Sequence, residues 1–157
     1  FKKTTIIIKI NYDKFLLNMI CLCILANMGD RFTKKVRSKI MSSIKSKNTW
    51  PEKEVRSYLH RHGYRFVLHD KRLPGKPDIV LPKYKTVVEV NGCFWHGHKC
   101  KGSGLPSTNK KFWEKKINNN IRRFKKNSLS LRQKGWRVIV IWECQVKKGN
   151  IKKLDRI

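Results

Sequence analysis

The sequence predicts a single mixed α/β domain with a central sheet flanked by helices. With 157 residues, the chain is long enough for one domain with a real core and too short for two ordinary domains. Apolar residues recur at helical spacing in some segments, and short β-branched runs stand between these segments. The resulting order is helix, three strands, helix, strand, and no internal repeat is visible.

Residues 1–27 differ in composition from the rest of the chain. Lysines precede an apolar run over 16–26, which only Asn18 interrupts. A basic segment followed by an apolar one has the shape of a signal peptide, but the run is too short to span a bilayer comfortably. The chain starts with Phe, and a polar composition begins at Met28. We therefore expect 1–27 to be upstream translated sequence or a dispensable extension, and the domain to cover 28–157 from its start at Met28.

Two helical segments are expected before the first strand. The segment 31–47 is basic, with apolar residues that include Met41 at helical spacing. A second helix begins within 48–52, where a capping side chain, a proline and an acid follow one another at the helix N-terminus. Gly63 ends this helix.

Three short strands are expected next, at 64–68, 78–81 and 86–90. The last is the best strand of the chain, because β-branched and apolar residues dominate it. Turns rich in proline, glycine and lysine separate the three strands, at 73–77 and 82–85.

The second half of the chain predicts a long helix from Phe112 to Arg132 and a final buried strand from Val138 to Trp142. Apolar side chains recur on one face of the helix, and basic residues cover the other face. The inward positions are Ile117, Ile121, Phe124 and Leu131. Gly135 ends the helix.

The chain is strongly basic, with 38 Lys and Arg against 10 acids and a formal net charge of +28. Such an excess attracts a polyanion, most plausibly nucleic acid, and binding releases counterions. A lysine-rich genome bias is the alternative explanation, so charge alone supports nucleic-acid binding only moderately.

Two of the few acids stand inside apolar strands. Asp78 begins one strand and Glu89 lies in the next, so a hairpin between them brings both carboxylates together. Magnesium prefers such hard oxygen ligands, and a bound cation promotes phosphodiester cleavage. The pattern is the skeleton of PD-(D/E)XK nucleases, with Asn91 where a lysine is often found. Alone it is a weak signal, because Asp78 can be a strand-start acid and Glu89 can pair with a lysine. Glu52 is explained equally well by its place in the first turn of a helix.

Thiols and imidazoles are concentrated in the segment 92–100, and Cys144 ends the last expected strand. Cys93, His98, Cys100 and Cys144 would form a closed Cys₃His zinc site and leave His96 free for chemistry, although spacing alone does not fix which histidine is the ligand. The alternative is a solvent-facing histidine-rich loop with buried free thiols. The 5 cysteines form no disulfide-like framework, which favours metal binding in a reducing compartment.

Two pairs of adjacent aromatic residues stand in basic surroundings, Phe94-Trp95 and Phe112-Trp113. Such pairs can stack on bases or wedge between them. They can equally belong to the core.

Several separate blocks together resemble the very-short-patch repair (Vsr) endonucleases. They are Leu73–Asp78, Asn91–Cys100, Phe112-Trp113, Gly135–Val138 and Trp142–Cys144, and they span about residues 31–146. The block GCFWHGHKC with a distant WEC is the most specific part. The resemblance implies a nick 5′ to the T of a T:G mismatch, which deamination of 5-methylcytosine leaves in DNA. It also implies a restriction-endonuclease-like sheet of the PD-(D/E)XK type.

The resemblance further implies roles for single residues. Asp78 and the backbone carbonyl of Val90 would hold Mg²⁺, His96 would be the general base, and Glu52 the N-terminal acidic catalytic residue. The implied ligands of a structural Zn²⁺ are Cys93, His98, Cys100 and Cys144. The implied aromatic wedge beside the mismatch consists of Phe94, Trp95 and Trp113, with Met41 intruding from the N-terminal arm.

The chain departs from the family pattern at two positions. Asn91 stands where the family usually has His, and Phe124 stands where it usually has Asp. In the family these side chains look like partners, so losing both avoids a stranded buried charge. We expect Asn91 to remain part of the catalytic centre and Glu89 to compensate as a second Mg²⁺ ligand.

The sequence therefore favours a Mg²⁺-dependent DNA mismatch endonuclease with a structural zinc site. A catalytically impaired, zinc-stabilised DNA-binding module is the second interpretation, supported by Asn91 and Phe124 and opposed by the retained Glu52, Asp78 and His96. A general zinc-stabilised nucleic-acid binder is the third, and the aromatic pairs oppose it. The expected partner is double-stranded DNA with a T:G mismatch, and mismatch-repair proteins are further candidates. We expect a monomer without membrane attachment, in the cytoplasm at the nucleoid.

Overall fold

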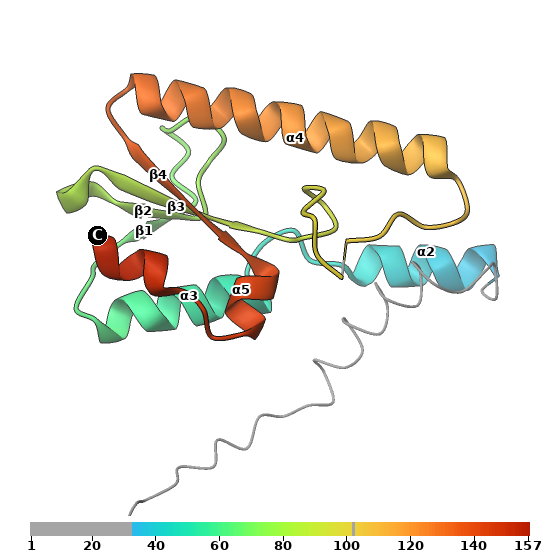
Figure 1. Cartoon of the computed structure of the whole chain (residues 1–157), viewed down its shortest axis with the longest axis horizontal. Helices are drawn as coiled ribbons and strands as arrows, with labels where there is room; N and C mark the ends of the chain where they lie inside the picture. The colour runs from blue at the N-terminus through green and yellow to red at the C-terminus, as the bar shows by residue number, and fades with distance from the viewer. Residues whose placement is uncertain (1–32, 102) are drawn as a thin grey trace, which may run out of the picture.

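The computed structural model describes residues 33–101 and 103–157, so the expected extension over 1–27 and the start at Met28 lie outside the described residues. Within them, a four-stranded sheet lies between two layers of helices (Figure 1). The elements are α2 (Lys34–Ser43), α3 (Trp50–Arg61), β1 (Val67–Leu68), β2 (Ile79–Leu81), η1 (Pro82–Tyr84), β3 (Thr86–Asn91), α4 (Lys110–Gln133), β4 (Arg137–Trp142), α5 (Glu143–Lys147) and η2 (Lys152–Arg156). The predicted mixed α/β fold is confirmed.

The sheet has the order β1-β2-β3-β4. β2 and β3 form the predicted antiparallel hairpin, with Ile79 opposite Val88. β4 runs parallel to β3, with Ile139 opposite Val88. Parallel neighbours need a crossover connection, and the 24-residue helix α4 supplies it.

Each face of the sheet has its own apolar core, because successive side chains along a strand point to opposite faces. Leu131 of α4 packs with Val80, Val87 and Val138 on one face. On the other face, the buried cluster contains residues of α3, β2, β3, β4, α5 and η2, and its members are Val55, Leu59, Ile79, Leu81, Val88, Ile139, Ile141, Val146 and Leu154. Figure 1 shows α4 above the sheet and α3 and α5 below it. The central strands are thus buried on both sides, which explains their nearly continuous apolar sequences.

The structure corrects the predicted first strand. Only Val67 and Leu68 pair with β2, and both are exposed at the edge of the sheet. Tyr64 and Phe66 instead pack against the core on the α3 side. Burial of these aromatic rings therefore outweighs further strand pairing.

The prediction that Cys144 ends the last strand is also wrong. β4 ends at Trp142, and Cys144 lies in the first turn of α5. The side chain of Gln145 accepts a 2.9 Å hydrogen bond from the Trp142 N–H, which caps the new helix at its N-terminus. The pattern of apolar residues in the strand continues into this turn, so it does not reveal that β4 ends and α5 begins here.

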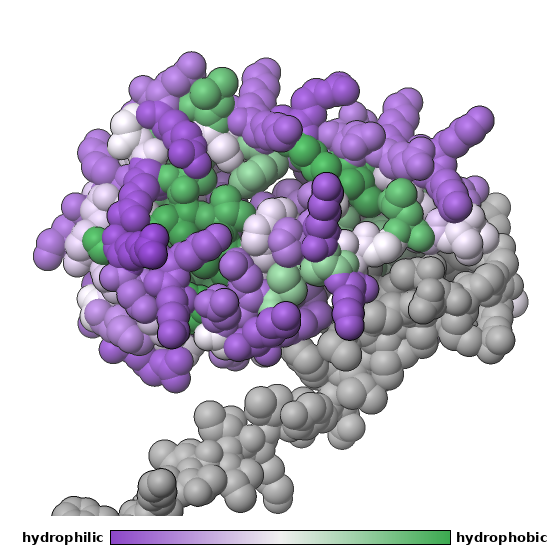
Figure 2. Space-filling model, in the orientation of Figure 1, coloured by the Kyte–Doolittle hydropathy of each residue, from purple (hydrophilic) through white to green (hydrophobic). Residues whose placement is uncertain are grey.

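Charge is concentrated along α4. Figure 2 shows hydrophilic side chains projecting over the length of this helix. Its exposed basic residues are Lys110, Lys111, Lys115, Lys116, Arg122, Arg123, Lys125, Lys126 and Arg132. Among the helices that the structure describes, none is both long and apolar enough to cross a bilayer.

Candidate active site and metal cluster

The hairpin of β2 and β3 places Asp78 and Glu89 together. Continuing the pairing register by one residue beyond Ile79 and Val88 sets Asp78 opposite Glu89. The Val90 N–H donates a 2.8 Å hydrogen bond to Oδ2 of Asp78. The Asp78 N–H in turn donates to the Glu89 carboxylate. Each carboxylate is therefore anchored by the backbone of the opposite strand, as a fixed pair of oxygen ligands requires.

Neither carboxylate of this pair has its charge fully compensated. Burial raises the pKa of Asp78 to about 6, although the Val90 N–H opposes the shift, and the charge of Glu52 adds to it. Burial and the repulsion from Asp78 raise the pKa of Glu89 to about 8. Two partly buried, mutually repelling carboxylates are stabilised by a divalent cation, and their hard oxygens fit Mg²⁺.

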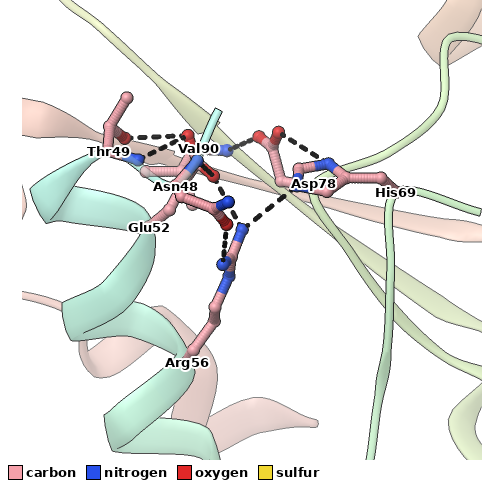
Figure 3. A network of polar contacts seen from close by, with 7 residues as sticks. All are labelled: Asn48, Thr49, Glu52, Arg56, His69, Asp78 and Val90. Carbon is pink, nitrogen blue, oxygen red and sulfur yellow. Dashed lines mark hydrogen bonds and ion pairs between the residues drawn. The ribbon is translucent and has the colours of Figure 1, made fainter. Parts of the chain in front are cut away.

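Glu52 is held within a polar network at the start of α3 (Figure 3). Its buried carboxylate accepts hydrogen bonds from the Asn48 N–H at 2.9 Å and from Oγ1 of Thr49 at 2.8 Å. A terminal nitrogen of Arg56 lies 2.7 Å from Oε2 of Glu52. Glu52 therefore caps the helix, as its position predicts, and also lies close enough to Asp78 to affect its pKa.

The network continues from Arg56 to His69 and Asp78, two steps that the sequence did not predict. The same terminal nitrogen of Arg56 lies 3.3 Å from Nε2 of His69, and Nδ1 of His69 lies 4.0 Å from Oδ1 of Asp78. Burial and the Arg56 charge lower the pKa of His69. Arg56 follows Glu52 by four residues, a spacing that indicates a helical ion pair. No spacing rule points to His69.

Asn91 and His96 lie at and beyond the end of β3. The Asn91 side chain is 3% exposed, and within the described residues its Nδ2 is buried without a hydrogen-bond partner. Nδ1 of His96 is also buried without a partner there. The His96 ring packs edge-on against Phe124 at 5.6 Å and Trp142 at 6.4 Å between centroids. Burial and the nearby Arg123 lower the pKa of His96, so the ring is neutral at neutral pH.

Cys93, His98, Cys100 and Cys144 form one cluster. Their ligand atoms all lie within 4.8 Å of one another, although Cys144 comes from a distant part of the chain. Nδ1 of His98 lies 3.6 Å from Sγ of Cys144, and the His98 ring stacks on Trp142 at 4.2 Å. Of the two histidines in this segment, the structure places His98 in the cluster and His96 outside it.

The cluster has the donor set of a closed metal site. Burial and the neighbouring thiols Cys100 and Cys144 raise the pKa of Cys93 to about 12, so the thiolate form needs a cation nearby. Ligand atoms around a tetrahedral zinc ion lie about 3.7 Å apart, so only a small contraction of the cluster is required. The four residues can therefore hold a metal ion.

Phe94, Trp95 and Trp113 form a contiguous aromatic group. The Phe94 ring lies 5.1 Å from Trp95 and 5.3 Å from Trp113, and the two tryptophan rings lie 6.1 Å apart. Phe94 is buried, whereas Trp95 and Trp113 are half-buried. Met41 is half-buried on α2, which lies at the same end of the molecule as the start of α4 (Figure 1). The aromatic group joins the Cys93–Cys100 segment to α4.

The fold and sites define an α/β protein with a carboxylate pair at a hairpin and a separate Cys₃His cluster. The family model of the DNA mismatch endonuclease Vsr matches residues 29–102. A type II nicking enzyme of Xanthomonas oryzae pv. oryzae, V.XorIIP, is 48% identical over 119 residues, which cover 76% of this chain and 88% of the relative. V.NmeAIP, a type II nicking enzyme of Neisseria meningitidis, is 48% identical over 132 residues, or 83% of this chain and 94% of the relative.

The DNA mismatch endonuclease Vsr of Escherichia coli K12 is 39% identical over 120 residues, which cover 76% of this chain and 77% of the relative. The chain belongs to the Vsr family. The resemblance that the sequence blocks predict is thereby confirmed.

Proposed function

We propose that the protein nicks DNA on the 5′ side of the T in a T:G mismatch, by Mg²⁺-dependent hydrolysis, in very-short-patch repair. Membership of the Vsr family supports a nuclease that acts on mismatched DNA. The observation that carries the proposal is the Asp78–Glu89 pair, because its two carboxylates are fixed by the opposing strands and both have raised pKa values.

In this proposal Asp78, Glu89 and the backbone carbonyl of Val90 hold the magnesium ion. The N–H and C=O groups of one strand residue point to the same side, so the Val90 carbonyl faces the strand on which Asp78 lies. When bound, Mg²⁺ neutralises charge on the phosphate and orients the attacking water. The side chain of Asp78 is 22% exposed, which leaves it accessible to the ion and to DNA.

His96 is the general base of the proposed reaction. Its lowered pKa keeps the ring neutral at neutral pH, which a base requires. Because Nδ1 is buried, the proton of the attacking water is accepted at Nε2. Asn91 ends β3 and contributes a carboxamide whose Nδ2 has no hydrogen-bond partner within the described residues. Glu52 acts through the polar network that reaches Asp78.

The Cys₃His cluster is proposed to hold a structural Zn²⁺, which fixes the Cys93–Cys100 segment to the start of α5. This segment carries the proposed wedge of Phe94 and Trp95, to which Trp113 of α4 is added. Met41 enters the DNA from the N-terminal side. The basic face of α4 neutralises the DNA backbone.

The proposed partner is double-stranded DNA containing the mismatch, bound by a monomer in the cytoplasm at the nucleoid, with mismatch-repair proteins as further partners. The formal charge of +28 supports the nucleic-acid partner.

A catalytically impaired DNA-binding module is the second candidate. Phe124 packs against His96 where the family usually has a carboxylate, and Asn91 cannot titrate. Both substitutions remove acid–base groups without removing the proposed wedge or the metal cluster.

The test uses the full chain and a labelled duplex with one T:G mismatch, with and without Mg²⁺. We expect a Mg²⁺-dependent nick on the T strand that Asp78→Asn abolishes. Asp70→Asn is the matched control, because Asp70 is paired with Arg72 at 2.7 Å and is not part of the carboxylate pair. Selective binding to the mismatch without any nick would favour the second candidate.

A further inference from the structure

His69 lies with its side chain next to Asp78 of the carboxylate pair and has an uncommon backbone conformation. Its backbone adopts a left-handed conformation, with φ at 50°, which is uncommon for residues other than glycine. This conformation sets the ring between Arg56 of α3 and Asp78 at the start of β2 (Figure 3). The ring is about one-fifth exposed, with 19% of its surface accessible.

Arg56 determines which ring nitrogen of His69 carries the proton. A guanidinium only donates hydrogen bonds and never accepts one. The terminal nitrogen that faces Nε2 of His69 has two hydrogens, of which one is directed to Glu52 and the other to His69. Nε2 must therefore be the acceptor, and the neutral ring carries its proton on Nδ1.

The orientation of Arg56 is itself fixed from two sides. Glu52 holds one terminal nitrogen at 2.7 Å, and Oδ1 of Asn48 holds the other at 2.6 Å. Both partners belong to the start of α3, and the Arg56 side chain is only 13% exposed. The guanidinium thus cannot turn away from His69 without breaking charge-assisted hydrogen bonds.

The Nδ1–H of His69 is directed at Asp78. The 4.0 Å between Nδ1 and Oδ1 is longer than a direct hydrogen bond and is within the range of an ion-pair contact. The contact is an attraction between the N–H dipole and the carboxylate, and it acts on Oδ1. The Val90 N–H holds the other oxygen, Oδ2. Asp78 is therefore restrained at both oxygens.

We propose that His69 is a positioning residue of the metal centre: Arg56 fixes it as the Nδ1–H tautomer, and its N–H orients Asp78 for a divalent cation. The inference rests on the proposed function, because it takes Asp78 as a metal ligand. It adds Arg56 and His69, to which the sequence motifs assign no role. Residues that orient a metal ligand without touching the metal typically lower the metal affinity by about 10- to 100-fold when they are replaced.

The tautomer is measured first, by ¹⁵N NMR of the imidazole rings in the full chain without added Mg²⁺ or Mn²⁺. We expect a protonated Nδ1 and an unprotonated Nε2 for His69, assigned from the signals that disappear in His69→Asn. Arg56→Met, which keeps the stem and removes the donors, should change the His69 signals and leave those of His62 unchanged. An Nε2–H tautomer in the wild-type chain would overturn the inference.

Metal affinity is measured next, as Mn²⁺ binding followed by electron paramagnetic resonance of the free ion. His69→Asn keeps a donor near the Nδ1 position but is smaller than histidine, whereas His69→Leu fills more of the space and has no donor. We expect His69→Leu to weaken Mn²⁺ binding about tenfold and His69→Asn to stay within about threefold of wild type. A purely structural role for the ring predicts the reverse order, and that order would overturn the inference.

His62→Leu is the matched control. His62 is the exposed residue that directly follows α3, and its Nδ1 contacts the Tyr58 carbonyl at 2.8 Å. We expect Mn²⁺ binding to be unchanged in this variant. The two measurements also distinguish failure of the inference from failure of the proposed function. If the wild-type chain has the Nδ1–H tautomer but binds no Mn²⁺, the proposed metal centre is overturned, and so is the role of His69. Mn²⁺ binding with the Nε2–H tautomer would overturn only the role of His69.

Discussion

The amide of Val90 and the carboxylate of Asp78 are joined across strands β2 and β3 by a 2.8 Å hydrogen bond. The bond holds one oxygen of Asp78 and stabilises its charged form, against the effect of burial. It also fixes the distance between the carboxylate and the strand that carries Glu89. The proposed metal centre therefore depends on the register of the hairpin, and not only on the identity of the acids.

Replacing Glu89 with Gln should change the pH dependence of stability. The folded protein holds a proton on Glu89 up to a pKa of about 8, whereas an unfolded glutamate releases it near its ordinary pKa of 4.5. Between these values the folded state binds more protons, so raising the pH destabilises the wild type. The full loss of stability is reached only above pH 8, where Glu89 is deprotonated in the folded state as well. We expect the free energy of unfolding of Glu89→Gln to fall by about 2 kcal/mol less than that of the wild type when the pH is raised to 8. This figure is smaller than the full pKa shift implies, because Glu89 is partly exposed.

Urea denaturation at pH 6 and pH 8.5, without Mg²⁺, measures this difference. Glu54→Gln is the control, because Glu54 is exposed on α3. The same Glu89→Gln variant should require more Mg²⁺ for nicking. Equal slopes of stability against pH in the wild type and Glu89→Gln would contradict the burial of a titrating carboxylate at this site.

Loss of the metal cluster should destabilise the fold. The shared site joins Cys144 of α5 to the Cys93–Cys100 segment, so His98→Ala weakens that link. We expect the melting temperature to fall by at least about 10 °C and the bound zinc to be lost. Native mass spectrometry and thermal denaturation measure the two effects. His60→Ala, at an exposed histidine of α3 outside the cluster, should retain the metal and the melting temperature.

Trp113→Ala should reduce recognition of the mismatch. Trp113 contacts both Phe94 and Trp95, so its loss removes one side of the proposed wedge. We expect the preference for T:G over T:A duplexes to fall about tenfold, because stacking on one base contributes about 1–3 kcal/mol. Fluorescence anisotropy with both duplexes measures the ratio.

Tyr84→Ala is the control for this prediction. Tyr84 is an exposed aromatic residue, but it precedes β3, whereas Phe94 and Trp95 of the wedge follow the other end of that strand. The T:G preference should persist in this variant. A similar loss in both variants would indicate a general effect on DNA binding.

The pH profile of nicking should report on His96. The neutral ring is the proposed base, so activity rises as the pH rises through the pKa of His96. Arg123 lowers this pKa by charge repulsion, and burial lowers it further. Arg123→Gln should therefore raise the pKa and shift the acid limb of the profile to higher pH. Phe124→Asp should shift it in the same direction, because it puts a carboxylate beside a ring that Phe124 now contacts at 5.6 Å.

Arg122→Gln is the matched control, since Arg122 is an equally exposed neighbour on α4. Its acid limb should stay in place. NMR titration of the His96 ring in each variant checks the pKa directly. A shift of the acid limb to lower pH in Arg123→Gln would rule out His96 as the titrating base.

The sequence predicted the parts of the molecule that depend on local patterns. The hairpin strands, the long helix α4 and the first turn of α3 with its acid follow from periodicity and capping chemistry. The grouping of Cys93, His98 and Cys100 also follows from their closeness in the chain. Prediction failed for β1 and for the start of α5, where burial of Tyr64 and Phe66 and capping by Gln145 outweighed strand alternation.

Membership of the Vsr family and the candidate site residues were therefore predicted from the sequence alone, because they are properties of residue types and their spacing. Tertiary structure alone decided how these side chains meet. It fixed the register in which Asp78 faces Glu89, set the ligand atoms of the Cys93, His98, Cys100 and Cys144 cluster within 4.8 Å of one another, and placed Arg56 against His69. Each of these contacts depends on strand register and on the packing of α3 and α5 against one face of the sheet. These are long-range relationships that no local pattern encodes.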